Sequence, residues 1–318
     1  MADASFYIIS EEEAGRTVGQ FLKNRLQFSA AHIRSLKFAP EGLTVNGERA
    51  RTDRVLCAGD RLAVPVGDSA ARPQRLLPYE GVPRALQVLY EDESLIVVDK
   101  PAGLAMHPAG GHTADTLANL LRSYFDSADP KARVHFAGRL DKDTSGVVLC
   151  AKTALAAEKL QKEKARGGFQ KTYFALAAGS FRLGTAQRID LPLREAKDPD
   201  SGLIRMYADP FGKPALTYYT VRQVFPAYAL LELRLDTGRM HQIRAHLAAA
   251  GHPLLVDLLY GEKAESGEGL ISRCALHAAE ICFLHPEDGR QITLSAPLPA
   301  DMAALTKPVR PGADPFLR

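Results

Sequence analysis

Apolar segments with the character of β-strands constrain the fold of this 318-residue chain more than any other feature. Four of them lie between Ser94 and Gly238, and they read SLIVVDKP, GVVLCAK, KTYFALAAG and YALLELRLDTG. In the last segment, leucines alternate with charged residues from Leu231 to Asp236. This alternation is typical of a strand with one buried face. The chain is therefore expected to contain a large β-sheet.

Helical segments separate these strands, and they read TADTLANLLRSYF, ALAAEKLQKEKAR and HQIRAHLAAAGHP. The third is expected to end at Gly251, with Pro253 beyond it, which is a common way for a helix to terminate. Strands and helices do not follow the regular strand–helix–strand order of a parallel sheet. We therefore predict an α+β fold, with a domain built on a large mixed, mainly antiparallel sheet with flanking helices.

The beginning of the chain has a different pattern, which predicts a small αα-then-ββ module over residues 1–66. An amphipathic stretch, RTVGQFLKNRLQ, predicts the first helix, and Ser29 is a candidate N-cap for the second. Asn46-Gly47 favours a tight hairpin turn between the two strands. Residues 67–84 combine Pro, Gly and Arg without periodicity, which predicts a linker. The second domain would then span residues 85–318.

Composition is that of an ordinary folded protein, with 46% hydrophobic and 24% charged residues. A net charge of +3 is only mildly basic, so charge alone does not indicate a nucleic-acid partner. No apolar stretch approaches the roughly 18 residues of a membrane-spanning helix, and the N-terminus lacks the features of a signal peptide. The four cysteines have no CxxC spacing: Cys57, Cys150, Cys274 and Cys282. We expect a cytoplasmic protein without membrane contact, disulfides or a metal site.

The stretch AGRLDKDTSGVVLC, residues 137–150, raises the question of function. An Asp-x-Asp-Thr turn is by default an ordinary turn with side-chain-to-backbone hydrogen bonds. Asp143 fits that interpretation. Asp141, with Arg139 two residues before it, could instead be a reactive carboxylate. The stretch alone leaves both interpretations open.

Five motifs, which include this stretch, follow one another along the second domain. They are YEDESLIVVDKPAGLAMHP (90–108), GRLDKDTSGVVLCAK (138–152), KTYFAL (171–176), DTGRMHQIRAHLAAAGHPLL (236–255) and LHAAEICFLHPEDG (276–289). This ordered set resembles the RluA-type pseudouridine synthases over roughly Leu86 to Leu298. Residues 1–66 resemble the S-four-type RNA-binding module that is often fused in front of that catalytic domain.

The resemblance implies an isomerase that converts specific uridines of RNA to pseudouridine, without a cofactor, by breaking the glycosidic bond and rejoining the turned base through C5. It implies that Asp141 is the nucleophile or base of this reaction and that Arg244 lies against it. It also places Tyr173 against a target base flipped out of its helix, and makes Arg139 a candidate contact to the flipped nucleotide or its phosphates. The implied partner is RNA, with large-subunit ribosomal RNA favoured over transfer RNA, and we expect a monomer.

Two departures from the family pattern concern loops near these residues. Gly138 stands where RluA-type proteins usually have His, and VDLLYG (256–261) replaces the usual Gly-Asp-Pro-Leu-Tyr-Gly.

Without the resemblance, Tyr173 would be interpreted as a core residue and Arg244 as a surface charge. His241 and His246 are separated by i, i+5, which places them on different sides of a helix, so we reject a zinc site there.

RNA binding by the first module must depend on local clusters, because residues 1–66 carry nine basic and eight acidic side chains, a net charge of +1. The candidates are Arg34 with Lys37, and Arg49, Arg51 and Arg54. Each cluster could also be an ordinary solvated surface.

Two other functions compete with the isomerase. The first is a non-catalytic RNA-binding protein of the same fold. The second is a Mg²⁺-dependent phosphohydrolase, because DKDTSG resembles the Asp-x-Asp-x-Thr motif of haloacid-dehalogenase-like phosphatases. That chemistry requires an apolar strand ending at the first aspartate, whereas here the apolar run follows the motif.

Overall fold

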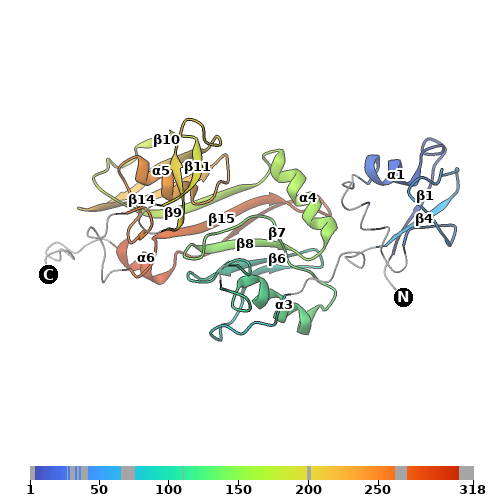
Figure 1. The fold of residues 1–318 in the computed structure, drawn as a ribbon, viewed down its shortest axis with the longest axis horizontal. Helices are drawn as coiled ribbons and strands as arrows, with labels where there is room; N and C mark the ends of the chain where they lie inside the picture. The colour runs from blue at the N-terminus through green and yellow to red at the C-terminus, as the bar shows by residue number, and fades with distance from the viewer. Residues whose placement is uncertain are drawn as a thin grey trace.

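The computed structural model describes residues 4–26, 28, 33, 36, 42–65, 76–109, 111–198, 202–261 and 271–307 (Figure 1). In the described part of the first module, a four-stranded sheet of order β1-β4-β2-β3 lies with the helix α1. Its elements are β1 (Ala4–Ile8), α1 (Val18–Asn24), β2 (Thr44–Val45), β3 (Glu48–Arg49) and β4 (Arg61–Pro65).

The amphipathic helix and the hairpin of this module are confirmed. Val18, Phe21 and Leu22 of α1 are buried in a small core. Asn46 and Gly47 join β2 to β3 with φ of 55° and 86°, the left-handed values that a tight hairpin turn requires. The order of elements differs from the expectation, because β1 precedes α1 and pairs with β4. The second predicted helix and its cap Ser29 fall largely outside the described residues.

The larger domain is built on one sheet whose strands follow the order β10-β13-β14-β9-β15-β8-β6-β5, with β16 paired to β15 and β7 to β8. Its strands are β5 (Gln87–Glu91), β6 (Leu95–Lys100), β7 (His135–Phe136), β8 (Ser145–Ala151), β9 (Gln170–Ala178), β10 (Ala186–Asp190), β13 (Leu216–Val224), β14 (Tyr228–Leu235), β15 (Leu276–Leu284) and β16 (Gln291–Ser295). All the described pairings in this sheet are antiparallel except that of β15 with β8. The predicted mixed, mainly antiparallel sheet is confirmed.

The helices in the described part of the larger domain are α3 (Leu117–Ala128), α4 (Ala154–Ala165), α5 (Gln242–Ala249) and α6 (Ala300–Leu305). Figure 1 shows α3 and α4 on opposite sides of β6 and β8. Ile96 of β6 accordingly packs in the cluster of α3, whereas Leu95 packs with Leu160 of α4. Burial of both faces explains why β6 and β8 are continuously apolar. Among the described residues, no helix is both long and apolar enough to cross a membrane.

The described part of the predicted linker, residues 76–84, packs against the larger domain. The backbone N–H of Tyr79 donates to Ser123 of α3 over 2.8 Å, and Asn119 donates to the carbonyl of Leu77 over 2.8 Å. Packing of the larger domain therefore begins at or before Leu76, upstream of the expected boundary. The separate folding of the two domains stays a prediction.

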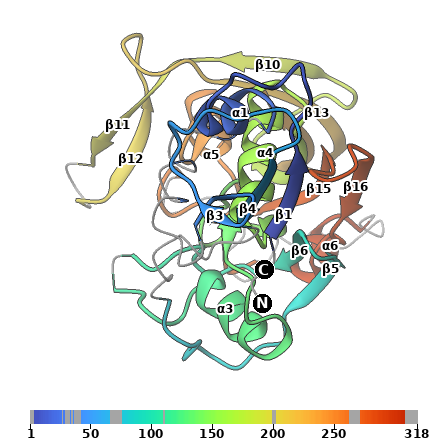
Figure 2. The same cartoon turned by 90° about the vertical axis from the view of Figure 1, so that its right-hand side faces the viewer.

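A two-stranded ribbon, which the sequence pattern did not predict, projects from the larger domain (Figure 2). It consists of β11 (Leu193–Lys197) and β12 (Ile204–Ala208). Met206 on the ribbon packs with Ala245 of α5 in a small apolar cluster. The ribbon is thereby attached to the helix that carries the HQIR motif.

Candidate active site

Asp141 lies in the turn between β7 and β8, and the buried side chain of Lys100 supports this turn from inside. The Lys100 ammonium donates to the carbonyls of Pro101, Leu104 and Lys142 over 3.0, 2.9 and 2.9 Å. These three hydrogen bonds join the end of β6 to the residue directly after Asp141. Because Lys100 fixes the backbone there, the position of Asp141 is determined by the core and not by the turn alone.

The start of β8 is fixed by a close approach to β15. Gly146 has φ of 112°, and a Cβ at this position would collide with the carbonyl of Ala278. Ser145 is hydrogen-bonded to Nδ1 of His277 over 2.9 Å in the same region. The glycine of the Asp-Thr-Ser-Gly sequence is therefore required by packing between strands.

Asp141 opens onto a cavity of about 690 Å³, which brings together β9, the end of β14 and the start of α5. All four residues assigned to the site from the sequence line this cavity: Arg139, Asp141, Tyr173 and Arg244. They come from widely separated positions in the sequence and meet only because the sheet places their elements together.

Arg244 lies between two carboxylates. Its Nη1 is 3.5 Å from Oδ2 of Asp141, and its Nε and Nη2 donate to the two oxygens of Asp257 over 2.8 and 2.7 Å. Burial alone would lower the pKa of Arg244, but the hydrogen bonds and charge of Asp257 outweigh this effect and raise it overall. Arg244 is thus a fixed positive charge beside Asp141.

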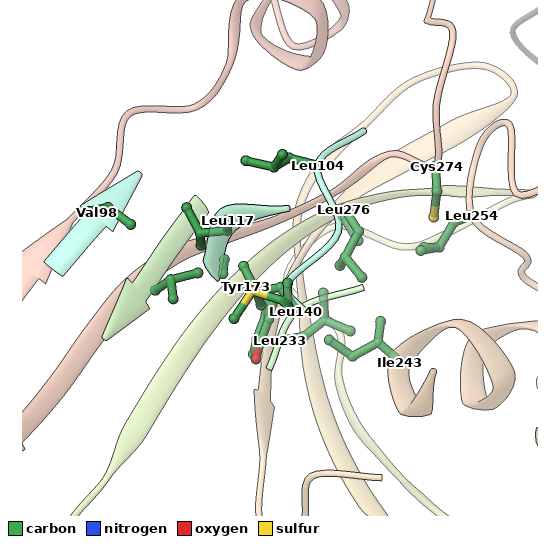
Figure 3. Close-up of a cluster of buried hydrophobic side chains, with 14 of the residues drawn as sticks. Val98, Leu104, Leu117, Leu140, Tyr173, Leu233, Ile243, Leu254, Cys274 and Leu276 are labelled. Carbon is green, nitrogen blue, oxygen red and sulfur yellow. The ribbon is translucent and has the colours of Figure 1, made fainter. Parts of the chain in front are cut away.

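Tyr173 lies on β9 with 8% of its surface exposed, so it belongs to the apolar core and to the cavity wall at once. Figure 3 shows its ring beside Leu140 and Leu233, with Ile243 projecting from α5 toward this group. Burial and then the negative charge of Asp141 raise the pKa of the Tyr173 hydroxyl. The tyrosine therefore offers a neutral aromatic surface to the cavity.

Cationic side chains without a described acidic partner line the same cavity. Arg139 is exposed, and Lys164 and Lys171 donate to the carbonyls of Ala137 and Val147 over 3.3 Å each. Desolvation and the nearby charge of Lys164 lower the pKa of Lys171 to about 8. This side of the cavity suits a polyanion.

Lys164 lies beside the glycine that departs from the family pattern. A Cβ at Gly138 would be 3.6 Å from its Nζ, so a large side chain at residue 138 would have to share space with the lysine.

Two further residues of the site were not predicted from the sequence. The sequence indicates Asp257 only as part of the altered VDLLYG segment, whereas in the structure it is buried and holds Arg244. The sequence suggests His241 only as a metal ligand, whereas in the structure its Nε2 lies 3.9 Å from Oδ2 of Asp141. The sequence feature that could have predicted His241 as a site residue is its position about one helical turn before Arg244.

The other histidine of this segment, His246, has a different environment. Its two ring nitrogens bond to Thr217 and to the carbonyl of Leu191 over 2.8 and 2.9 Å. Within the part of the chain that the structure describes, no three His, Cys, Asp or Glu side chains are grouped to hold a metal ion.

The candidate RNA contacts of the first module are only partly described. Arg49 is exposed on β3, and Arg54 lies 3.7 Å from Glu48. Arg51 is exposed in the segment between β3 and β4. Arg34 and Lys37 lie outside the described residues.

Comparisons with known proteins point to one family. The family model for RNA pseudouridylate synthase matches residues 94–249. The uncharacterized RNA pseudouridine synthase YhcT of Bacillus subtilis is 34% identical over 94% of this chain and 95% of its own length. The ribosomal large subunit pseudouridine synthase D of Yersinia pestis is 31% identical over 97% of this chain and 95% of its own.

A solved structure is also similar to this chain. The human protein named RNA pseudouridylate synthase domain containing 1 is 25% identical in sequence and superimposes with a TM-score of 0.55. The match covers 68% of this chain and 86% of the human chain. The extent and identity of the sequence matches are sufficient to establish the family. The chain belongs to the RluA-type RNA pseudouridine synthases and is an isomerase.

Proposed function

We propose that this enzyme isomerises specific uridines of RNA through Asp141, with the target base flipped into the 690 Å³ cavity. The observation that carries the proposal is the contact of Arg244 with Asp141 at the edge of a cavity walled by Tyr173. A uridine inside a helix cannot reach a carboxylate in such a cavity without leaving its stack. Tyr173 then supplies an aromatic surface for the extruded base.

The reaction conserves all atoms, so it requires neither an oxidant nor an energy source. The N1–C1′ bond breaks and its electrons leave with the uracil, which turns and forms a new bond from C5 to C1′. C5 then loses its proton and N1 gains one. Asp141 acts as nucleophile at the reacting centre or as base, and Arg244 compensates its charge without taking part in bond formation.

Ribosomal RNA of the large subunit is the substrate that we favour. Relatives that match nearly the whole chain are named ribosomal large subunit pseudouridine synthase D. The cations Arg139, Lys164 and Lys171 suit the phosphates around a flipped nucleotide. Mapping pseudouridines in cellular RNA with and without the gene tests this target, and a site lost from transfer RNA alone would contradict it.

Replacement of Asp141 by Asn tests the catalytic assignment. An amide of the same shape cannot act as nucleophile or base, so turnover should fall by about 10⁴-fold while RNA affinity stays within about threefold. Asp143→Asn, in the same turn but exposed, is the matched control and should keep its activity. Turnover of Asp141→Asn within tenfold of the wild type would refute the assignment.

The alternative functions have less support. A phosphohydrolase requires a strand that ends at its first aspartate, but the strand before Asp141 is the two-residue β7, and the apolar strand β8 follows it. A non-catalytic RNA-binding protein of this fold would not require the Asp257–Arg244–Asp141 arrangement. The cytoplasmic location and the monomeric state stay predictions.

A further inference from the structure

His241 has a backbone conformation that a non-glycine residue rarely adopts. It is the N-cap residue directly before α5, with φ of 50° and ψ of 21°, and its side chain makes no capping hydrogen bond. A left-handed residue of this kind costs about 1–3 kcal/mol and is usually retained where its side chain has a task. Its Nε2 faces Oδ2 of Asp141 at 3.9 Å, and its Nδ1 lies 3.1 Å from the hydroxyl of Tyr260.

The hydroxyl of Tyr260 has a second partner, which decides how it can bond to His241. The backbone N–H of Met206, on the β11–β12 ribbon, donates to the Tyr260 oxygen over 2.8 Å. A backbone N–H can only donate, so this oxygen accepts there and keeps its own proton for another partner. Within the described part of the chain, the acceptor within reach of that proton is Nδ1 of His241.

We propose that Tyr260 donates to Nδ1 and thereby holds His241 in the neutral tautomer whose Nε2–H faces Asp141. The opposite tautomer would direct the Nε2 lone pair at a carboxylate, which is electrostatically unfavourable. Burial raises the pKa of Tyr260 to about 12, so its hydroxyl keeps its proton at neutral pH. Burial also lowers the pKa of His241, which favours the neutral ring.

The role of this N–H rests on the proposed function of Asp141. At 3.9 Å the contact is too long for a hydrogen bond, so Nε2–H is a donor free to bond to the carboxylate or to the uracil once RNA fills the cavity. Tyr260 acts through His241 and is a positioning residue. The charged groups that surround the imidazole are Asp141, Arg244, Asp257 and Arg139.

The turn at residues 257–260 positions both side chains that face Asp141, namely Arg244 and His241. The backbone N–H groups of Leu259 and Tyr260 donate to Oδ1 of Asp257, whose carboxylate holds Arg244. The Arg244 guanidinium lies 5.2 Å from the centre of the Tyr260 ring. The VDLLYG segment therefore positions a cation and an N–H donor around one carboxylate, through Asp257 and Tyr260.

Two-bond ¹H–¹⁵N spectra of ¹⁵N-histidine-labelled full-length enzyme at pH 7 test the proposal without RNA. The His241 signals, assigned by their absence in His241→Gln, should show a protonated Nε2 and an unprotonated Nδ1. A protonated Nδ1, or a doubly protonated ring, would overturn the proposal in the wild-type protein itself. Tyr260→Phe should change this pattern, whereas Tyr207→Phe, which removes a hydroxyl on β12 bonded to Asp198, should not.

Kinetics of the same variants test the role of the N–H. Tyr260→Phe should lower kcat about tenfold and leave KM for RNA within about twofold, because the hydrogen bond that positions His241 is lost, together with the one from Met206 on the ribbon. Unchanged kcat in Tyr260→Phe and in His241→Gln would refute the role. If Asp141→Asn proved active while His241 kept the Nε2–H tautomer, the proposed function would fail and the tautomer assignment would stand.

Discussion

Asp257 binds Arg244 more closely than Arg244 approaches Asp141, with contacts of 2.7 and 2.8 Å on one side and 3.5 Å on the other. The side chain of Asp257 is fully buried, so its charge depends on this arginine for compensation. The guanidinium is consequently fixed by two bonds before substrate arrives, and only its remaining nitrogen faces the carboxylate of the cavity. Asp257 thus determines where the positive charge of the site lies.

Asp257→Asn should impair both stability and turnover. The substitution removes the carboxylate that holds Arg244 at hydrogen-bond distance and leaves only Asp141, at 3.5 Å, to compensate the buried charge, which should lower the free energy of unfolding by about 3 kcal/mol. We also expect kcat to fall at least tenfold, because Arg244 is no longer held in place. Urea unfolding and single-turnover kinetics measure the two effects.

The matched control for this variant is Glu232→Gln, whose partner Arg222 is about half exposed. An exposed ion pair contributes little, so this change should cost less than about 1 kcal/mol. Equal losses of stability in the two variants would contradict the role of Asp257.

Lys100 should make the stability of the enzyme depend on pH. Burial lowers the pKa of this lysine from its ordinary value of 10.5 to about 7. Between these two values the unfolded chain binds more protons than the folded one, so the free energy of unfolding should rise as the pH is raised from about 7 to about 10. Each pH unit should contribute up to about 1.4 kcal/mol.

Urea unfolding of Lys100→Met across this pH range measures the contribution. The variant should lose the part of the rise that Lys100 provides. Lys171, with a pKa of about 8, and Lys164, whose pKa is also lowered by burial, contribute in the same direction in both proteins. The variant should also be less stable at high pH, because the neutral amine of Lys100 can still donate to two of its three backbone carbonyls and the variant has no donor there. Lys159→Met, at an exposed ion pair, should follow the wild-type curve.

Gly146→Ala should destabilise the protein by about 3 kcal/mol or more. The added Cβ would meet the carbonyl of Ala278 across the β8–β15 pairing, and the left-handed φ of 112° is unfavourable for alanine. Gly138→Ala is the control, since its Cβ would meet only Lys164 Nζ at 3.6 Å. Thermal unfolding measures the melting temperatures of the two variants. Similar melting temperatures would show that β8 can move away from β15.

The arginines of the first module should contribute to RNA affinity without affecting chemistry. We expect the combined replacement of Arg49, Arg51 and Arg54 by Gln to weaken binding of long structured RNA. Each phosphate contact removed should lower the slope of log affinity against log salt concentration by about 0.7 to 0.9. Turnover at saturating RNA should stay within about twofold, and an unchanged salt slope would show that these residues do not contact RNA.

Local sequence patterns were sufficient to predict much of the fold. The apolar segments of β6 and β8 and the alternating leucines of β14 became strands, and the three predicted helical segments became α3, α4 and α5. Each of these predictions depends on the pattern of apolar residues over a short stretch of sequence. The ribbon of β11 and β12 could not be predicted in this way, because its strands are short, largely exposed and stabilised by α5.

Site residues that lie in a sequence motif could be predicted, whereas those whose role depends on tertiary contacts could not. Asp141, Arg244 and Tyr173 were named from motifs, and the structure brings them to one cavity. Asp257 and His241 gain their significance from partners that are distant in the sequence or from a left-handed backbone, and neither is visible in a local pattern. The chemical roles of all five residues are proposals for the experiments above.

The central position of β15 has a consequence for the synthesis of this enzyme. In the strand order, β15 is the link between β9 and β8, so it joins the half of the sheet that carries Tyr173 to the half whose turn carries Asp141. Ser145 and His277, which contact each other across this link, are 132 residues apart. On the ribosome, β15 emerges after both halves have been made. A nascent chain that lacks it has both sets of site residues but no strand to unite them, so modification of RNA must wait until β15 has been made.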